Sequence, residues 1–166
     1  MAGYVIHIAI ANEYVKKHDD IENHEEFIKG TIYPDSVKDK SQTHYGPNSS
    51  NPNLVKFLEE HKEMSDFEKG YFLHLVSDYI FYRILDENPD DRIYSDYDIL
   101  NDELVEKYNV KVPKEIENVI HSKQGDLTYL SIKLVENFIE DVSNESIEEY
   151  ITEIMENPQK WLDFNC

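Results

Sequence analysis

Two ionisable residues lie four positions apart in the most apolar stretch of the chain, GYFLHLVSDYIFY at residues 70–82. A helix projects residues i and i+4 from one face, so His74 and Asp78 are placed to contact each other or a shared ligand. The predicted helix is hydrophobic on nearly every side, which indicates that it is buried. A buried carboxylate needs a cationic partner or a metal ion, because leaving it unpaired is energetically costly or shifts its pKa.

The first 50 residues contain three more histidine and aspartate residues that are candidates for the same site. His7 is the only ionisable residue in the apolar run YVIHIAIA, Asp35 follows a proline in YPDS, and His44 lies in THYG. Imidazole and carboxylate donors without a thiolate suit zinc or another first-row divalent metal. The sequence therefore predicts a metal site, with these candidate ligands: His7, Asp35, His44, His74 and Asp78.

Each candidate also has an ordinary structural interpretation. His74 and Asp78 can form a buried hydrogen bond that joins helices, and His7 can be a core histidine with a satisfied ring. Asp35 can be a helix cap or turn residue, and His44 can be solvated in a loop. The occurrence of all five together favours the metal site over these separate interpretations.

The remaining histidines are expected to play no part in such a site. His18, His24 and His61 belong to acidic or polar segments and are predicted to lie on the solvated surface. His121 ends a predicted helix, where a positive charge interacts favourably with the helix dipole. Asp96 and Asp98 in IYSDYDILND are open to two interpretations, as helix caps or as carboxylates that reach a neighbouring site.

The elements that must position these residues are all helices. No Asn-Gly, Asp-Gly or Gly-Gly pair separates alternating apolar runs, so β-hairpins are not expected. A chain of 166 residues is the right size for one domain, and we predict a single all-α helical bundle over residues 1–166. Helices are predicted at residues 4–17, 22–33, 54–61, 65–87, 94–108, 113–121, 126–142, 145–156 and 159–164. A long loop that carries part of the site is predicted at residues 35–53, which are rich in Ser, Asn, Pro and Gly.

Composition narrows the classes of function. The formal charge of −19, from 35 acidic and 16 basic residues, opposes binding to phosphate backbones and anionic membrane surfaces. An apolar fraction of 40%, with 12 Tyr and 7 Phe, predicts a folded protein. No segment approaches the roughly 20 apolar residues of a membrane span. Cys166 is the lone cysteine, so no internal disulfide is expected. With no signal peptide recognised, a cytoplasmic location is expected.

The order of the candidate ligands resembles that of a known family. His7, then PD at Asp35, HYG at His44 and the HLVSD helix are similar to the zinc-dependent phospholipase C family, whose superfamily also contains zinc-dependent single-strand nucleases. The similarity covers roughly residues 4–82. It implies an all-α bundle in which His44, His74, Asp78 and Asp35 surround one zinc ion, while Asp78 bridges to a second ion held by His7. It also implies that Asp35 is a candidate general base.

The chain departs from that family in two respects. Family members are generally secreted, and their mature amino-terminal tryptophan contributes metal ligands, whereas this chain begins MAGY. A third metal needs further His and Glu ligands, but His121 is the only histidine after Asp78 and no glutamate stands four residues beyond it. One or two ions are therefore expected, with Asp96 or Asp98 as a potential additional ligand.

Three functions remain open from the sequence. The first is a metal-dependent phosphoester hydrolase that uses zinc-activated water on a phospholipid head group or a small phosphorylated metabolite. The second is a non-catalytic domain with a structural or sensory ion and a basic protein partner. The third keeps the fold without metal and pairs His74 with Asp78. A nucleic-acid substrate is not expected, because no basic groove with stacking aromatic residues is visible.

Overall fold

The computed structural model describes residues 2–165, and all regular secondary structure in this range is helical. The all-α prediction is confirmed, while Cys166 lies outside the described residues. In chain order the helices are α1 (Tyr4–Lys17), α2 (His24–Ile32), η1 (Tyr33–Asp35), α3 (Lys40–His44), α4 (Leu54–Glu60), α5 (Asp66–Arg83), α6 (Arg92–Lys107), η2 (Lys114–Val119), α7 (Ile132–Asn144), α8 (Ile147–Glu156) and η3 (Lys160–Leu162), where η marks a 3₁₀ helix.

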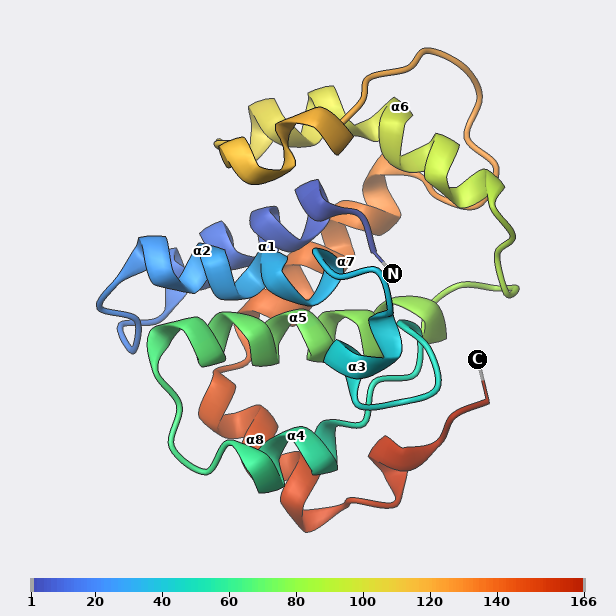
Figure 1. Ribbon diagram of the computed structural model, residues 1–166. Helices are drawn as coiled ribbons and strands as arrows, with labels where there is room; N and C mark the ends of the chain where they lie inside the picture. Colours follow the sequence, from blue (N-terminus) through green and yellow to red (C-terminus); the bar gives the residue numbers. More distant parts are fainter. Residues whose placement is uncertain (1, 166) are drawn as a thin grey trace.

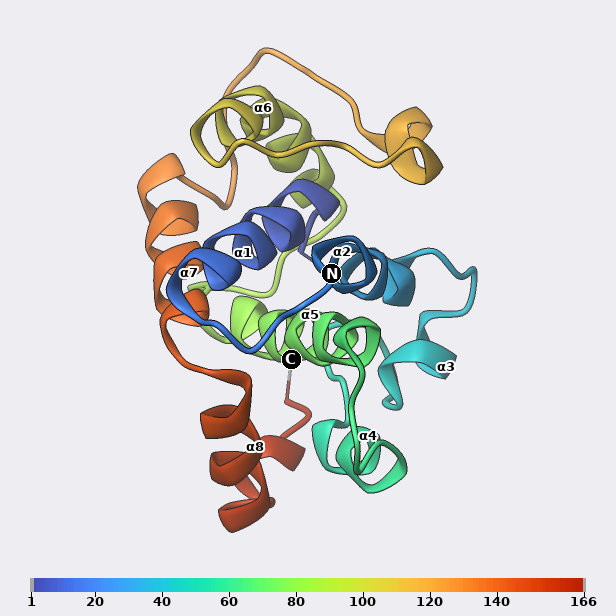
Figure 2. The same cartoon turned by 90° about the vertical axis from the view of Figure 1, so that its left-hand side faces the viewer.

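Helix α5 runs through the middle of the molecule (Figure 1). Helix α2 packs along α5, and α1 packs against both α2 and α7. Figures 1 and 2 show α6 beyond α1 on one side, and α4 and α8 on the opposite side of α5. Buried apolar side chains from these helices form one continuous cluster. No described helix combines the length and the hydrophobicity that crossing a membrane requires.

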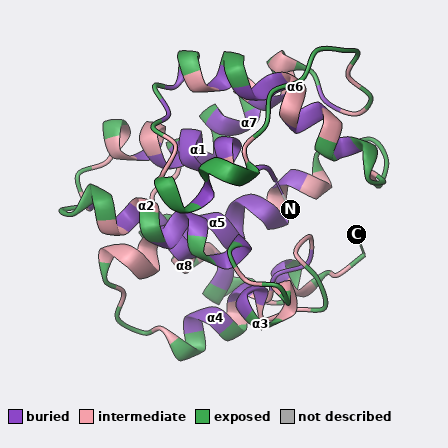
Figure 3. Cartoon of the chain, turned by 45° about the horizontal axis from the view of Figure 1, so that its top comes forward, coloured by how far each residue is buried: buried purple, intermediate pink, exposed green. Residues whose placement is uncertain are grey.

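The start of α5 is fixed by a capping box. The Ser65 hydroxyl accepts the backbone N–H of Glu68, and the Glu68 carboxylate accepts the backbone N–H of Ser65. From Gly70 to Tyr79 every residue of the helix is buried, so polar groups in this stretch are enclosed by protein (Figure 3). The helix ends at Arg83, four residues short of the predicted end.

Two glycines bring α2 and α5 into backbone contact. A Cβ atom on Gly30 would lie 1.8 Å from the carbonyl oxygen of Phe67, and one on Gly70 would lie 2.0 Å from that of Phe27. Only a residue without a side chain permits such an approach. The close packing places the backbone of Thr31 beside the buried middle of α5, where a histidine side chain meets it.

The predicted loop at residues 35–53 was wrong in its central part. The 3₁₀ helix η1 ends at Asp35, and α3 forms at Lys40–His44 because the Asp39 carboxylate accepts the backbone N–H of Ser41. Tyr45 then adopts φ of 59°, which ends the helix. His44 consequently lies on a short helix and is fully buried.

The second half of the chain is less helical than predicted. In place of the helix predicted at residues 113–121 the chain forms the 3₁₀ helix η2 at Lys114–Val119, and α7 begins at Ile132, six residues later than expected. The Asp96 carboxylate accepts three consecutive backbone N–H groups, those of Thr128, Tyr129 and Leu130, over 2.7–2.9 Å. These bonds hold the segment before α7 in a non-helical conformation.

Candidate metal centre

The two residues that first indicated a site lie side by side on α5. His74 Nε2 is 3.1 Å from Asp78 Oδ2, the separation expected of an i, i+4 pair on one helix face. Both side chains are essentially inaccessible to solvent. The backbone N–H of Ala2 also donates to Asp78 Oδ1 over 2.9 Å, so the segment that precedes α1 contacts this carboxylate directly.

Helix α1 contributes His7 to the same point. His7 Nε2 lies 3.1 Å from Asp78 Oδ1, the oxygen opposite the one that faces His74. The imidazole rings of His7 and His74 are stacked, with centroids 3.7 Å apart and an interplanar angle of 12°. Asp78 therefore presents one oxygen to each of two parallel imidazoles.

The segment between α2 and α4 supplies the other two side chains. Asp35, at the end of η1, places Oδ2 3.6 Å from His74 Nε2 and Oδ1 3.8 Å from His44 Nε2. His44, at the end of α3, places Nε2 3.0 Å from Asp78 Oδ2. The structure thus brings all five predicted side chains into one buried cluster.

Backbone carbonyl groups orient two of the histidines. His74 Nδ1 lies 2.7 Å from the carbonyl oxygen of Thr31, and His44 Nδ1 lies 2.9 Å from that of Lys40. A carbonyl oxygen only accepts, so Nδ1 of each ring carries the proton. In the neutral rings, Nε2 then directs a lone pair at the carboxylates of Asp35 and Asp78. Metal-binding histidines typically show this arrangement.

The cluster passes a test of fit for a divalent cation. Neither carboxylate oxygen of Asp35 meets a hydrogen-bond donor among the described residues, and His74 Nε2 and the two ring nitrogens of His7 have no hydrogen-bond partner there either. Lone pairs that face one another in a buried space repel, and a cation between them removes the repulsion. The contacts between the facing N and O atoms span 3.0–3.8 Å. Tetrahedral zinc with ligands at about 2.1 Å sets neighbouring donors about 3.4 Å apart.

Four of these residues converge most tightly. One donor atom from each lies within 4.8 Å of the others, in the set His7, Asp35, His74 and Asp78. This group can hold a metal ion, and His44 lies in direct contact with it through Asp78. The donors are oxygen and nitrogen atoms, as zinc and other first-row divalent metals prefer.

Protonation offers the protein a second way to neutralise the cluster. Burial lowers the pKa of His74, but the carboxylates of Asp35 and Asp78 outweigh it and raise that pKa to about 10. Burial also opposes ionisation of Asp78, yet His74 and His7 hold its pKa well below the usual 3.8. Burial and the neighbouring His74 lower the pKa of His7. Without a metal, a protonated His74 therefore pairs with the two carboxylates, as in the third function considered from the sequence.

A pocket of about 380 Å³ leads to the cluster between α1, α6 and η2. Asp35 lines it and is only 4% exposed, whereas Tyr94 and Val119 also line it and are 49% and 56% exposed. Asp35 therefore belongs both to the buried histidine cluster and to a space that solvent can enter. Sequence reasoning missed Tyr4, which also lines this pocket and stands one helical turn before His7. The three-residue spacing between Tyr4 and His7 places both on one helix face, and this spacing could have indicated that Tyr4 lies near the site.

The two acidic residues left open by the sequence have different positions. Asp96 is not a metal ligand, because its carboxylate is buried and accepts the three backbone N–H groups before α7. Asp98 lines the pocket, and no hydrogen bond or ion pair in the described part of the chain joins its carboxylate to the five cluster side chains. Of the two residues that the sequence left open, Asp96 is therefore engaged elsewhere and does not complete the site.

The other histidines lie outside the cluster, although two of them are less exposed than predicted. His18 is half-buried, stacks on Tyr14 with ring centroids 4.2 Å apart, and lies 2.8 Å from the carbonyl oxygen of Ser143. His61 is half-buried and pairs with Glu68 over 2.8 Å. The prediction of solvated surface is wrong for these two histidines and correct for the exposed His24.

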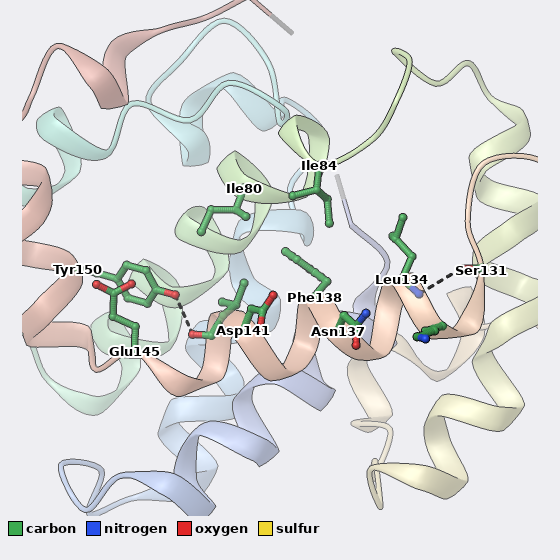
Figure 4. A pocket seen from close by; sticks show the side chains of 11 residues that line it. Ile80, Ile84, Ser131, Leu134, Asn137, Phe138, Asp141, Glu145 and Tyr150 are labelled. Atoms are coloured by element: carbon green, nitrogen blue, oxygen red, sulfur yellow. Dashed lines mark hydrogen bonds between the residues drawn. The ribbon is translucent and has the colours of Figure 1, made fainter.

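A larger pocket, of about 610 Å³, lies away from the histidines. Figure 4 shows Ile80 of α5 and Ile84, the residue after α5, facing Leu134 and Phe138 of α7 across it. Its lining contains carboxylates and one lysine at the rim but no histidine. Size alone therefore does not identify the chemical site of this protein, since the smaller pocket contains the unpartnered Asp35.

The position of the cluster in the fold depends on local helix features. Helices α1 and α5 carry His7 and His74 on buried faces, and η1 and α3 carry Asp35 and His44 to the same depth.

No protein-family model, curated protein or solved structure matches this chain. The site is therefore interpreted from its own geometry.

Proposed function

We propose that this protein is a zinc-dependent phosphoester hydrolase of the phospholipase C type. The observation that carries the proposal is Asp35, a carboxylate with no hydrogen-bond donor on either oxygen, placed both in the histidine cluster and in the lining of an open pocket. A purely structural carboxylate would be satisfied by backbone or side-chain donors, as Asp96 is.

The donor set assigns roles to the residues. In this proposal His7, Asp35, His74 and Asp78 would hold the metal, and His44, which contacts Asp78, would add a ligand or help to hold a second ion. Zinc bound there would supply a Lewis acid, which would polarise a phosphoryl oxygen and lower the pKa of bound water toward about 7.

The chain's own groups carry the rest of the reaction. Asp35 lines the pocket and would accept a proton from the attacking water as its oxygen bonds to phosphorus. The ester P–O bond would break, and the proton would pass from Asp35 to the departing oxygen, so that a neutral alcohol leaves. Asp35 is only 4% exposed, so bulk water is largely excluded from the side of this carboxylate that faces the histidines. The positive charge of the ion offsets the −19 of the chain where a phosphoryl group has to bind.

The substrate we propose is a small phosphoester, such as a phospholipid head group or a phosphorylated metabolite. A nucleic-acid substrate is not part of the proposal, since the acidic chain opposes a phosphate backbone. A cytoplasmic location is part of the proposal, because a single cysteine provides no internal disulfide.

A direct test combines elemental analysis with hydrolysis of p-nitrophenyl phosphate and bis-p-nitrophenyl phosphate. We expect one or two zinc ions per chain and turnover that a chelator abolishes. Asp35→Asn should lower the rate about 100-fold or more, the range of general-base catalysis. His24→Ala is the control, because this exposed residue lies outside the cluster. A metal-loaded Asp35→Asn variant with an unchanged rate would remove the general-base role.

A second candidate function is a non-catalytic domain with a structural or sensory ion and a protein partner. The specific observation in its favour is the burial of all five cluster side chains, each at most 4% exposed. Structural zinc sites close around the ion with four protein ligands, whereas catalytic sites keep an open position. Retention of zinc after prolonged exposure to chelator, without turnover of either phosphoester, would favour this function over hydrolysis.

A further inference from the structure

The pocket that ends at Asp35 has an aromatic wall. Tyr4 from α1 and Tyr94 and Tyr97 from α6 line it, and the rings of Tyr94 and Tyr97 meet edge to face with centroids 6.0 Å apart. Val119 at the end of η2 and Ile120 after it add apolar surface. The space beyond the buried carboxylate is therefore suited to a flat apolar group.

The tyrosines keep their hydroxyl protons at neutral pH. Burial and the nearby charge of Asp35 raise the pKa of Tyr4 to about 12. Burial, with smaller effects of Asp91 and Asp35, raises the pKa of Tyr94 as well. The pocket wall thus carries neutral phenols and adds no negative charge next to Asp35.

The pocket is poorly suited to several phosphate groups. Of the described residues that line it, Lys40 and His121 are the ones that can carry positive charge. The Lys40 ammonium donates to the backbone carbonyl oxygens of Asp35 and Val37, so two of its three donors are already engaged. Asp98 adds a carboxylate to the lining. A second or third phosphate would therefore face a carboxylate and few available donors.

The lining residues of the pocket differ in how far they are exposed to solvent. Asp35 is buried, at 4% exposure, as are Tyr97 and Asn101 at 6%, while Tyr94, Val119 and His121 are exposed. A phosphoryl group bound at the cluster therefore directs its alcohol outward, along Tyr94 and Val119. The volume of about 380 Å³ is near the lower end for small-molecule pockets, which favours a compact alcohol.

We infer that the preferred substrate is an ester of a single phosphoryl group with an aromatic alcohol, whose ring packs against Tyr94 and Val119. This inference rests on the proposed hydrolase function and adds to it the class of the leaving group. Tyr94 acts as a specificity-determining residue, and its exposed position separates substrate selection from the metal ligands.

Binding of phosphonates tests the inference without turnover, because their C–P bond is not hydrolysed. Zinc-loaded protein is titrated calorimetrically with phenylphosphonate and methylphosphonate, which share the phosphoryl end and differ in the ring. We expect phenylphosphonate to bind about tenfold more tightly. In Tyr94→Ala the two affinities should converge to within about threefold, with the zinc content retained. Tyr94→Phe is the matched control, since it keeps the ring and should keep the preference.

The outcomes distinguish this inference from the proposed function. Equal zinc-dependent affinities for the two phosphonates would overturn the aromatic preference and leave the hydrolase proposal standing. A preference that persists in Tyr94→Ala would place the ring elsewhere and also overturn it. Failure of both phosphonates to bind in a zinc-dependent manner would overturn the hydrolase proposal together with this inference.

Discussion

His74 donates its Nδ1–H to the carbonyl oxygen of Thr31 over 2.7 Å, across the contact between α5 and α2. This bond fixes the ring so that Nε2 faces the carboxylates of Asp35 and Asp78. An element with no side-chain ligand of its own, α2, therefore sets the orientation of a central imidazole. The metal site depends on how these two helices pack as well as on the identities of the ligands.

Asp78→Asn should remove metal and lower stability together. Asp78 contacts three imidazoles and accepts the N–H of Ala2, all in a buried space. Removing one member of a buried charged cluster typically costs about 3–5 kcal/mol. Elemental analysis and thermal unfolding with and without chelator measure both effects. Asp98→Asn should change neither, because no hydrogen bond or ion pair among the described residues joins the Asp98 carboxylate to the cluster.

His44→Ala should reduce stability as well as metal content. The residue is fully buried on α3, and its Nδ1 is held by the carbonyl oxygen of Lys40. From the sequence alone, a loop position predicts little loss of stability. The buried position predicts a loss of about 1–3 kcal/mol in the free energy of unfolding. Denaturant unfolding of chelator-treated protein tests this, with the exposed His121→Ala as control.

Gly70→Ala should weaken metal binding although Gly70 carries no ligand. The added Cβ would lie 2.0 Å from the carbonyl oxygen of Phe27, so α2 and α5 must move apart. That movement withdraws the Thr31 carbonyl from His74, and overpacking of this kind costs about 1–3 kcal/mol. Competition with a chromogenic chelator gives the change in zinc affinity.

Gly3→Ala is the matched control for that experiment. A Cβ atom on Gly3 would meet the Tyr97 ring at 3.1 Å, and a side chain adjusts more easily than a backbone carbonyl. Equal zinc affinities for Gly70→Ala and the unaltered protein would show that the approach of α2 to α5 does not control the site.

Glu145→Gln should stabilise the protein above about pH 6. Burial and the neighbouring carboxylates of Glu153 and Glu149 raise the pKa of Glu145 from 4.5 to about 6. A raised folded-state pKa gives stability that is present below pH 4.5 and lost as pH rises through 6. The neutral glutamine side chain of the variant does not ionise and so avoids this loss of stability. The melting temperature of the variant should therefore rise relative to that of the unaltered protein between pH 4.5 and pH 7. Exposed Glu148→Gln should show a smaller divergence, and equal divergence would point to a general charge effect.

The helices with strong local signals were predictable from sequence. The bounds of α1 agree with the apolar run at residues 4–17, and Ser65 with Glu68 marked the start of α5. The meeting of five imidazole and carboxylate groups was anticipated from residue type and order. These features depend on the types and spacing of side chains, which can be read directly from the sequence.

The features that were missed depend on backbone groups. Nothing in the residue types of Thr31 and Lys40 shows that their carbonyl oxygens orient two histidines. The late start of α7 follows from a carboxylate on α6, Asp96, that lies more than 30 residues away in sequence from the amides it binds. Helix propensity is estimated from neighbouring residues, so it cannot include a hydrogen-bond partner that is distant in sequence.

Gly30 of α2 and Gly70 of α5, each of which lies against the backbone of the other helix, can help to recognise distant relatives of this chain. Histidine and aspartate four residues apart occur on many helices, so the ligand pattern alone selects weakly. Gly70 precedes His74 by one helical turn, and Gly30 stands directly before Thr31. A chain that keeps the five cluster residues but has a larger residue at either glycine cannot pack α2 on α5 in this way. A search profile that weights both glycines as heavily as the ligands should therefore separate true relatives from chance matches.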